Sequence, residues 1–162
     1  MNKHDIFKQI KTELEKTLAN TERQRNESQH EANQHKGRMQ SRYDTFKEEA
    51  QMMVAAHEVR MAELRASLAQ VQAVLDRPSV FKPTDTIRVG AVIALEANDG
   101  TRRRHVLSPT GGGIQVVSGS TELMVITPDS PIGKRLVGLK MGDEIEIDVG
   151  GNKRNYQIVE VE

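Results

Sequence analysis

Proline and glycine are distributed very unevenly along this chain of 162 residues. The first 77 residues contain no proline and a single glycine, Gly37, whereas all five prolines and eleven of the twelve glycines lie from Pro78 onward. Proline breaks helices and glycine weakens them, so a segment without them can form long uninterrupted helices. Their later abundance is typical of short strands joined by turns. We therefore expect an α+β protein that changes character near Arg77.

Apolar residues in the first half repeat with spacings that alternate between four and three. In the second helix this stripe comprises Ala50, Val54, His57, Met61, Leu64, Leu68, Val71 and Leu75. The first helix starts a similar stripe and then turns polar; its apolar members are Phe7, Ile10, Leu14 and Leu18. Such a narrow stripe suits one partner helix, so residues 1–77 are predicted to form an antiparallel coiled-coil hairpin. The alternative is a coiled coil that dimerises, as in an adaptor protein.

The break between the two helices is expected near residue 41. Gly37 suits the end of the first helix, and the side-chain oxygens of Ser41 and Asp44 suit the start of the second. Each helix would then contain about 32–36 residues and span roughly 50 Å at the standard rise.

Three acidic side chains gather at the start of the second helix: Asp44, Glu48 and Glu49. Acids near a helix N-terminus complement the helix dipole, which is the ordinary structural reason for finding them there. A second interpretation is metal binding, because Asp44 and Glu48 are four residues apart and share one helix face. Mg²⁺ needs only one or two protein carboxylates when water or phosphate completes its shell. The tip of the hairpin is thus the candidate site for chemistry.

The second half reads as a linker over residues 78–86, stiffened by two prolines, followed by a domain over 87–162. Strands are expected over 89–95, 103–107, 114–117, 122–127, 144–149 and 156–161. One short helix should begin after Ser130 as its N-cap, with Pro131 at its first position, and end at Gly138. A bent antiparallel sheet wrapped on this helix is the simplest arrangement.

Composition excludes several classes of function. The chain has no cysteine, which removes disulfides and thiol chemistry, and none of its five histidines pairs at a zinc-ligand spacing. Lys and Arg together number 23, as do Asp and Glu, and this neutrality argues against binding free nucleic acid. The run from Arg102 to Arg104 is a solvated surface, or it meets an acidic partner or a nucleic-acid backbone. Without a secretory or membrane-spanning segment in the sequence, we expect a cytoplasmic protein.

The segment from Ser130 to Glu144 resembles the C-terminal signature of the Gre family of bacterial transcription elongation factors, GreA and GreB. It reads Ser-Pro-Ile-Gly-Lys-Arg-Leu-Val-Gly-Leu-Lys-Met-Gly-Asp-Glu. The opening over 90–95 and the closing strand over 156–162 match as well. The resemblance implies a coiled-coil hairpin and an FKBP-like domain that docks at the secondary channel of RNA polymerase. It also implies that Ser130, Pro131 and Ile132 shape the docking surface.

The resemblance further implies how such a factor acts. The coiled coil enters the channel, and two tip acids help the active site of the polymerase bind a second Mg²⁺, so that backtracked RNA is hydrolysed. The factor would hold no cofactor stably, would not be an enzyme by itself, and would be an elongated monomer without membrane contact. It would meet nucleic acid only within the elongation complex. Aromatic residues make up 3% of the chain, too few for the aromatic pocket of a prolyl isomerase.

The tip departs from the family pattern. Cleavage factors of the family carry an acid three residues after the tip aspartate, whereas this chain has Lys47 there and Glu48 one residue later. One residue corresponds to about 100° of rotation on a helix. Glu48 either takes the role of the second acid, with Tyr43 and Glu49 beside the pair, or the protein binds the channel as an inhibitor or pausing modulator without stimulating cleavage.

Overall fold

The computed structural model describes residues 2–34, 42–149 and 151–162 and contains two compact units. The sheet unit comprises Met1–Thr12 and Gln70–Glu162, and the helical unit comprises Glu13–Ala69. The division therefore falls within the two long helices. The N-terminal end of the first helix and the C-terminal end of the second belong to the sheet unit. In the described part of the chain, no helix combines the length and the apolar character that crossing a membrane requires.

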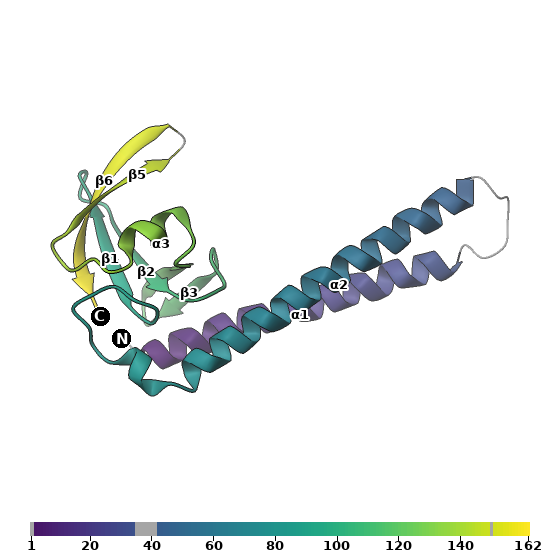
Figure 1. Cartoon of the computed structure of the whole chain (residues 1–162), viewed down its shortest axis with the longest axis horizontal. Helices are drawn as coiled ribbons and strands as arrows, with labels where there is room; N and C mark the ends of the chain where they lie inside the picture. The colour runs from purple at the N-terminus through teal and green to yellow at the C-terminus, as the bar shows by residue number, and fades with distance from the viewer. Residues whose placement is uncertain (1, 35–41, 150) are drawn as a thin grey trace. The chain divides into compact units, whose positions relative to one another are not determined.

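Two long helices form the N-terminal half, as predicted: α1 (Lys3–Gln34) and α2 (Arg42–Leu75), of 32 and 34 residues. Within the helical unit they lie side by side (Figure 1). Ion pairs join Glu22 to Arg65 and Arg25 to Glu58, so residue numbers rise along α1 as they fall along α2. The helices are therefore antiparallel there, which confirms the predicted hairpin.

The stripe that joins the helices of the helical unit is narrow. Among the described side chains of this unit, the buried ones are Leu14, Thr21, Ala32, Ala50 and Leu64. Two of the five are alanines and one is a threonine whose hydroxyl donates to the carbonyl of Thr17 at 2.9 Å. The predicted change from an apolar to a polar stripe after Leu18 is thus visible in the packing.

The C-terminal half forms one six-stranded sheet in the order β3-β4-β2-β1-β6-β5. Its strands are β1 (Val92–Ala97), β2 (Arg102–Leu107), β3 (Gln115–Ser118), β4 (Thr121–Ile126), β5 (Glu144–Val149) and β6 (Asn152–Val161). The sheet is mixed, because β4 runs parallel to β2. The expectation of a wholly antiparallel sheet was wrong at this pair. The chain passes β2 to form the edge strand β3, and the return hairpin then places β4 between β3 and β2.

Strand β1 begins three residues later than expected, and Gly90 is the reason. Gly90 has φ +93° and donates its N–H to the carbonyl of Leu107 at 2.8 Å, so the chain turns before the strand starts. A Cβ at Gly90 would lie 2.8 Å from the carbonyl oxygen of Val80. Strand β6 begins four residues earlier than expected, because its pairing with β5 continues to the turn.

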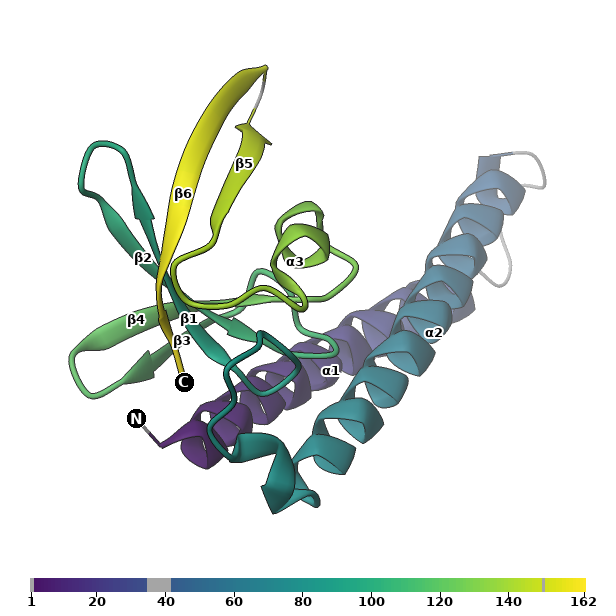
Figure 2. The same cartoon turned by 60° about the vertical axis from the view of Figure 1, so that its left-hand side comes forward.

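The core of the sheet unit lies against α3 (Pro131–Leu136), which contributes the fully buried Leu136. Its other buried members are Ile87, Ala91, Ile93, Leu95, Leu107, Ile126, Ile145 and Ile158. This cluster draws on five of the six strands and on the segment before β1. The α+β fold class predicted from the sequence is therefore confirmed, with one short helix packed on a sheet (Figure 2).

The start of α1 also packs within the sheet unit. Phe7 and Ile10 are fully buried, and the ring of Phe7 lies 5.4 Å from that of Phe81. Phe81 ends a short 3₁₀ helix, Pro78–Phe81, in the proline-bearing linker. The side-chain amide of Gln9 donates to the carbonyl of Val117 at 2.7 Å and accepts its N–H at 3.0 Å, and so occupies the free edge of β3. The first apolar residues of the predicted stripe are therefore buried within the sheet unit.

Candidate functional site

The tip of the hairpin includes the first two turns of α2. Arg42 is the first residue of this helix, so the backbone of Asp44 lies inside its first turn. Gly37 and Ser41, expected at the turn, lie outside the described residues, and only the backbone of Tyr43 and Asp44 is described. By helical geometry, positions 44 and 48 share one face, and position 47 is rotated about 100° from position 48.

The described side chains of the tip point to solvent. Glu48 and Glu49 are exposed, and so is Lys47 between them and Asp44. No group of three or more His, Asp or Glu side chains is placed to hold a metal ion within residues 2–34, 42–149 and 151–162. The tip therefore offers individual carboxylates that a partner's site could use.

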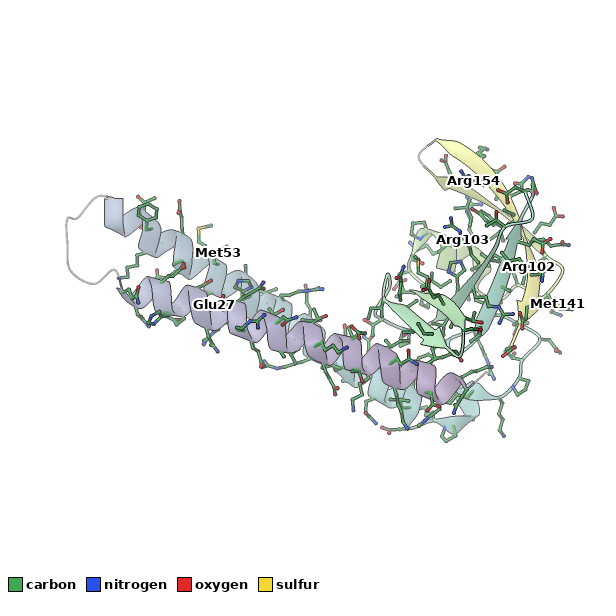
Figure 3. All side chains as sticks on the ribbon, turned by 180° about the vertical axis from the view of Figure 1, so that it is seen from behind. Glu27, Met53, Arg102, Arg103, Met141 and Arg154 are labelled. Atoms are coloured by element: carbon green, nitrogen blue, oxygen red, sulfur yellow. The ribbon has the colours of Figure 1, made fainter. Side chains whose placement is uncertain are left out.

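Large apolar side chains are also exposed along the same part of α2, and the sequence interpretation missed them. Their exposed fractions are 56% for Phe46, 72% for Met52, 53% for Met53 and 62% for Val59. Figure 3 shows Met53 on α2 and Glu27 on α1. The available signal was the position of these residues off the heptad stripe, because apolar residues at other positions of the helix do not face the coiled-coil partner.

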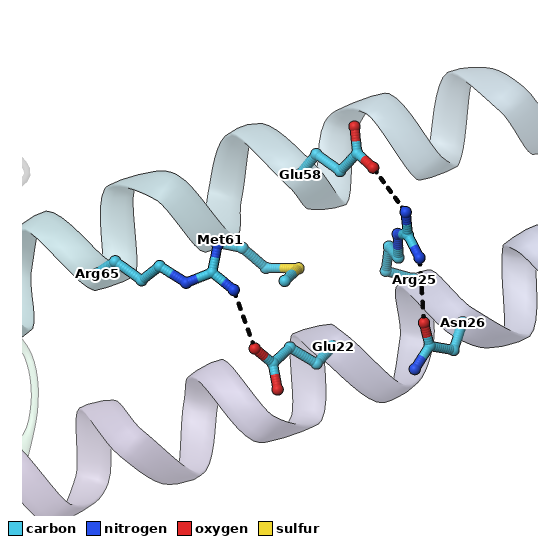
Figure 4. A pocket seen from close by; sticks show the side chains of 6 residues that line it. All are labelled: Glu22, Arg25, Asn26, Glu58, Met61 and Arg65. Atoms are coloured by element: carbon cyan, nitrogen blue, oxygen red, sulfur yellow. Dashed lines mark hydrogen bonds and ion pairs between the residues drawn. The ribbon is translucent and has the colours of Figure 1, made fainter.

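A polar gap separates the helices in the middle of the helical unit. Arg25 Nη2 lies 2.9 Å from Glu58 Oε1, Arg65 Nη2 lies 3.2 Å from Glu22 Oε1, and Met61 lies between the two pairs (Figure 4). They surround a cavity of about 480 Å³. These ion pairs are partly exposed, so they contribute little to stability.

The predicted docking segment begins with a helix cap that forms as expected. Ser130 Oγ accepts the N–H of Gly133 at 3.0 Å and donates to the carbonyl of Thr127 at 2.6 Å. Pro131 is the first residue of α3. Gly133 is buried, and a Cβ there would lie 1.9 Å from the carbonyl oxygen of Thr127. The Ser-Pro-Ile-Gly sequence is thus explained by the need to place a helix directly on the end of β4.

The outward face of this segment is a mixture of apolar and basic side chains. Pro131 is exposed, and Ile132 is half-buried because it packs on the core. Further along the segment, Lys134, Arg135, Val137 and Met141 are also exposed; Figure 3 labels Met141, whose exposed fraction is 67%. Of the three predicted docking residues, Ser130 therefore holds the turn, while Pro131 and part of Ile132 are available to a partner.

Comparison with known proteins covers both halves of the chain. The model of the family described as "Transcription elongation factor, GreA/GreB, C-term" matches residues 82–162, which is half of the chain. The transcription elongation factor GreA of Lachnoclostridium phytofermentans is 25% identical over 163 aligned residues, covering 98% of this chain and 92% of that one. GreA of Halorhodospira halophila is 31% identical over 104 residues, covering 64% and 61% of the two chains.

Among solved structures, the chain is similar to Gfh1 of Thermus aquaticus, with 20% identity and a TM-score of 0.39, over 93% of this chain and 92% of that one. It is also similar to GreA factor homolog 1 (Gfh1) of Thermus thermophilus, with 20% identity and a TM-score of 0.38, over 94% of each chain.

Proposed function

Because the chain belongs to the GreA/GreB family of transcription elongation factors, we propose that it binds bacterial RNA polymerase at its secondary channel and inserts the tip of its hairpin there. The sheet unit docks through the outward face of α3, where Pro131 and Ile132 meet the polymerase and Ser130 holds the turn. The hydrolytic site belongs to the polymerase, so the protein acts as an accessory factor.

The observation that carries this proposal is the exposed carboxylate of Glu48 one turn after Asp44. Hard oxygen donors suit Mg²⁺, and two carboxylates on one helix face suffice when a partner supplies the remaining ligands. A bound Mg²⁺ supplies Lewis-acid activation of water for phosphodiester hydrolysis. Asp44 and Glu48 would hold the ion within the complex, while Tyr43 and Glu49 flank them. In this form the protein stimulates cleavage of backtracked transcripts.

Lys47 favours a second candidate function. Its exposed ammonium occupies the position where cleavage factors of the family carry their second acid. A cation beside Asp44 opposes the binding of a divalent metal ion. In that case the hairpin occupies the channel, slows elongation or changes pausing, and does not stimulate cleavage.

Stalled, backtracked complexes of bacterial RNA polymerase with Mg²⁺ separate these functions. We expect the wild-type protein to raise the rate of transcript cleavage. The double variant Asp44→Asn with Glu48→Gln should lose more than about tenfold of that effect, because even outer-shell partners of a metal contribute that much. Glu27→Gln, which removes an exposed carboxylate of α1, is the matched control and should retain full stimulation.

Three other outcomes contradict parts of the proposal. Cleavage that survives in the double variant removes the tip acids from the mechanism. If the wild-type protein slows elongation and does not stimulate transcript cleavage, the second candidate function, inhibition or changed pausing, is the correct one. A protein that does not bind the polymerase, and that sediments as a stable dimer through residues 5–75, would instead be a coiled-coil adaptor.

A further inference from the structure

A cleft opens in the sheet where β2 and β4 diverge. The two strands pair only over residues 105–107 with 124–126. Before that point, residues 102–104 of β2 pair with β1, and residues 121–123 of β4 pair with β3. Figure 2 shows the ends of the β1–β2 and β3–β4 hairpins pointing apart. Within the described chain, the two strand edges that face each other across this opening are unpaired.

The cleft has a volume of about 380 Å³, and all three arginines of β2 contribute to its lining, together with His105, Gln115, Glu122, Leu123 and Met124. Register explains why these residues meet. His105 lies opposite Met124, which lies opposite Gln115, so the three form a row across β2, β4 and β3. Arg103 and Glu122 each lie two residues earlier in their strands, and therefore on the same face of the sheet as that row.

The three arginines of β2 differ in their ion pairing. Arg102 pairs with Glu96, and Arg104 pairs with Glu160 at 2.9 Å. Side chains alternate between faces along a strand, so Arg103 lies on the opposite face from both. Arg103 has no ion-pair partner among the described residues, and Figure 3 labels it beside Arg102. One guanidinium with five hydrogen-bond donors thus stays available at the rim of the cleft.

His105 is buried in the lining of the cleft with an unmade hydrogen bond. Its exposed fraction is 7%, and its Nδ1 has no hydrogen-bond partner within the described part of the chain. Burial, and next the charge of Arg103, hold the pKa of His105 below its ordinary value. A buried polar nitrogen without a partner lowers the stability of the fold. A ligand that supplies the missing partner would recover part of this free energy.

The opposite rim has a different character. Glu122 is exposed and forms no ion pair with any described residue, and Met124 has an exposed fraction of 40%. The cleft therefore presents one unpaired cation on β2, one unpaired carboxylate on β4, and an adaptable apolar surface between them. The other two arginines of its lining are paired with Glu96 and Glu160. This balance disfavours a nucleic-acid backbone, because Glu122 would repel its phosphates.

We propose that this cleft is a docking site for an extended peptide segment of a partner protein, which places one acidic side chain on Arg103 and one basic side chain on Glu122. Addition of an extended segment satisfies free strand edges through main-chain hydrogen bonds, and the side-chain contacts then select the sequence. Arginine binds carboxylates through two parallel hydrogen bonds, which makes Arg103 the principal anchor. The site lies outside the hairpin tip and the α3 face, and it does not depend on the proposed function.

A displayed library of random octapeptides, selected on the immobilised full-length chain, tests the proposal without RNA polymerase. We expect enrichment of peptides that carry an acidic and a basic residue two positions apart within β-forming sequence. The most enriched peptide is then titrated against the ¹⁵N-labelled full chain. It should shift the amide signals of residues 102–105 and 121–124 together with the imidazole signals of His105, which peptide adhesion elsewhere would leave unmoved.

Matched variants complete the test. Arg103→Gln should weaken binding of the enriched peptide about tenfold, the value of one charge-assisted hydrogen bond, and Glu122→Gln should relax the requirement for a basic residue. Arg154→Gln, which changes an exposed arginine of β6 that does not line the cleft, should leave affinity within about twofold. Two results would overturn the proposal: a selection that enriches no sequence, or enriched peptides that bind the Arg103→Gln protein as well as the wild type. Neither result depends on whether the chain binds RNA polymerase.

Discussion

The sheet unit and the helical unit differ in what holds them together. The sheet unit buries nine aliphatic side chains in one cluster that draws on five strands and α3, so each residue is held by elements far apart in sequence. The helical unit buries five of its described side chains along one narrow stripe, and partly exposed ion pairs join its helices. We therefore expect cooperative unfolding in the sheet unit and local opening in the helical unit.

The largest effect should come from Gly133→Ala. The added methyl group would meet the carbonyl of Thr127 at 1.9 Å, and this backbone atom cannot move without displacing α3 from β4. We expect a loss of about 3 kcal/mol or more in the free energy of unfolding of the sheet unit. Denaturant titration checks it, with the exposed neighbour Lys134→Ala as a control that should change stability by less than about 0.5 kcal/mol. If Gly133→Ala leaves the free energy of unfolding unchanged, α3 does not depend on the close contact between Gly133 and the carbonyl of Thr127.

Leu64→Ala should cost about 2 kcal/mol, at the low end for a buried leucine, because two helices can close on the space that it leaves. The loss should remain local. Native-state hydrogen exchange should therefore accelerate at amides within residues 13–69 and stay unchanged in the strands. Equal acceleration in both units would contradict the contrast between them.

Acidification should destabilise the sheet unit through His105. Burial, and next the charge of Arg103, lower the pKa of His105 in the folded protein from its ordinary 6.5. Below pH 6.5 the unfolded chain therefore takes up a proton more readily than the folded one, and stability falls as the pH is lowered through this value. Thermal unfolding of wild type and His105→Gln between pH 7.5 and pH 5 tests it. The variant should lose less stability on acidification, and identical slopes would exclude His105 as the cause.

The smallest effect is expected from the ion pair of Arg25 and Glu58. Its side chains are 34% and 55% exposed, so a double-mutant cycle with Arg25→Gln and Glu58→Gln should give a coupling of less than about 1 kcal/mol. The coupling should shrink further at high salt. A coupling well above this value would mean that the polar gap stabilises the hairpin, and would weaken the contrast with the sheet unit.

Much of the fold could be predicted from local sequence signals. The long helices follow from the absence of proline and from the heptad stripe, and the start of α3 follows from Ser130 before Pro131. Helix boundaries and caps depend on neighbouring residues, so a single sequence carries them. The late start of β1 escaped prediction, since it depends on contact between Gly90 and the distant Val80.

The candidate functional residues were likewise only partly predictable from the sequence. Asp44, Glu48 and Glu49 were identified by their spacing on one helix, and their role as metal ligands stays a prediction. The cleft between β2 and β4 could not be identified from sequence, although the arginine run was noticed. Which of the three arginines lacks a partner depends on the strand pairing that brings Glu96 and Glu160 to the opposite face.

By itself, the sequence determined the order of the elements, the helical and sheet halves, and the acidic residues at the tip. These properties depend on interactions within a few residues of each other along the chain. Only the tertiary structure decided that β4 lies parallel to β2, that the first turns of α1 belong with the sheet, and that Arg103 and His105 share a cleft. Each of these depends on which distant segments bury one another, and that choice is made by the packing of the whole sheet unit.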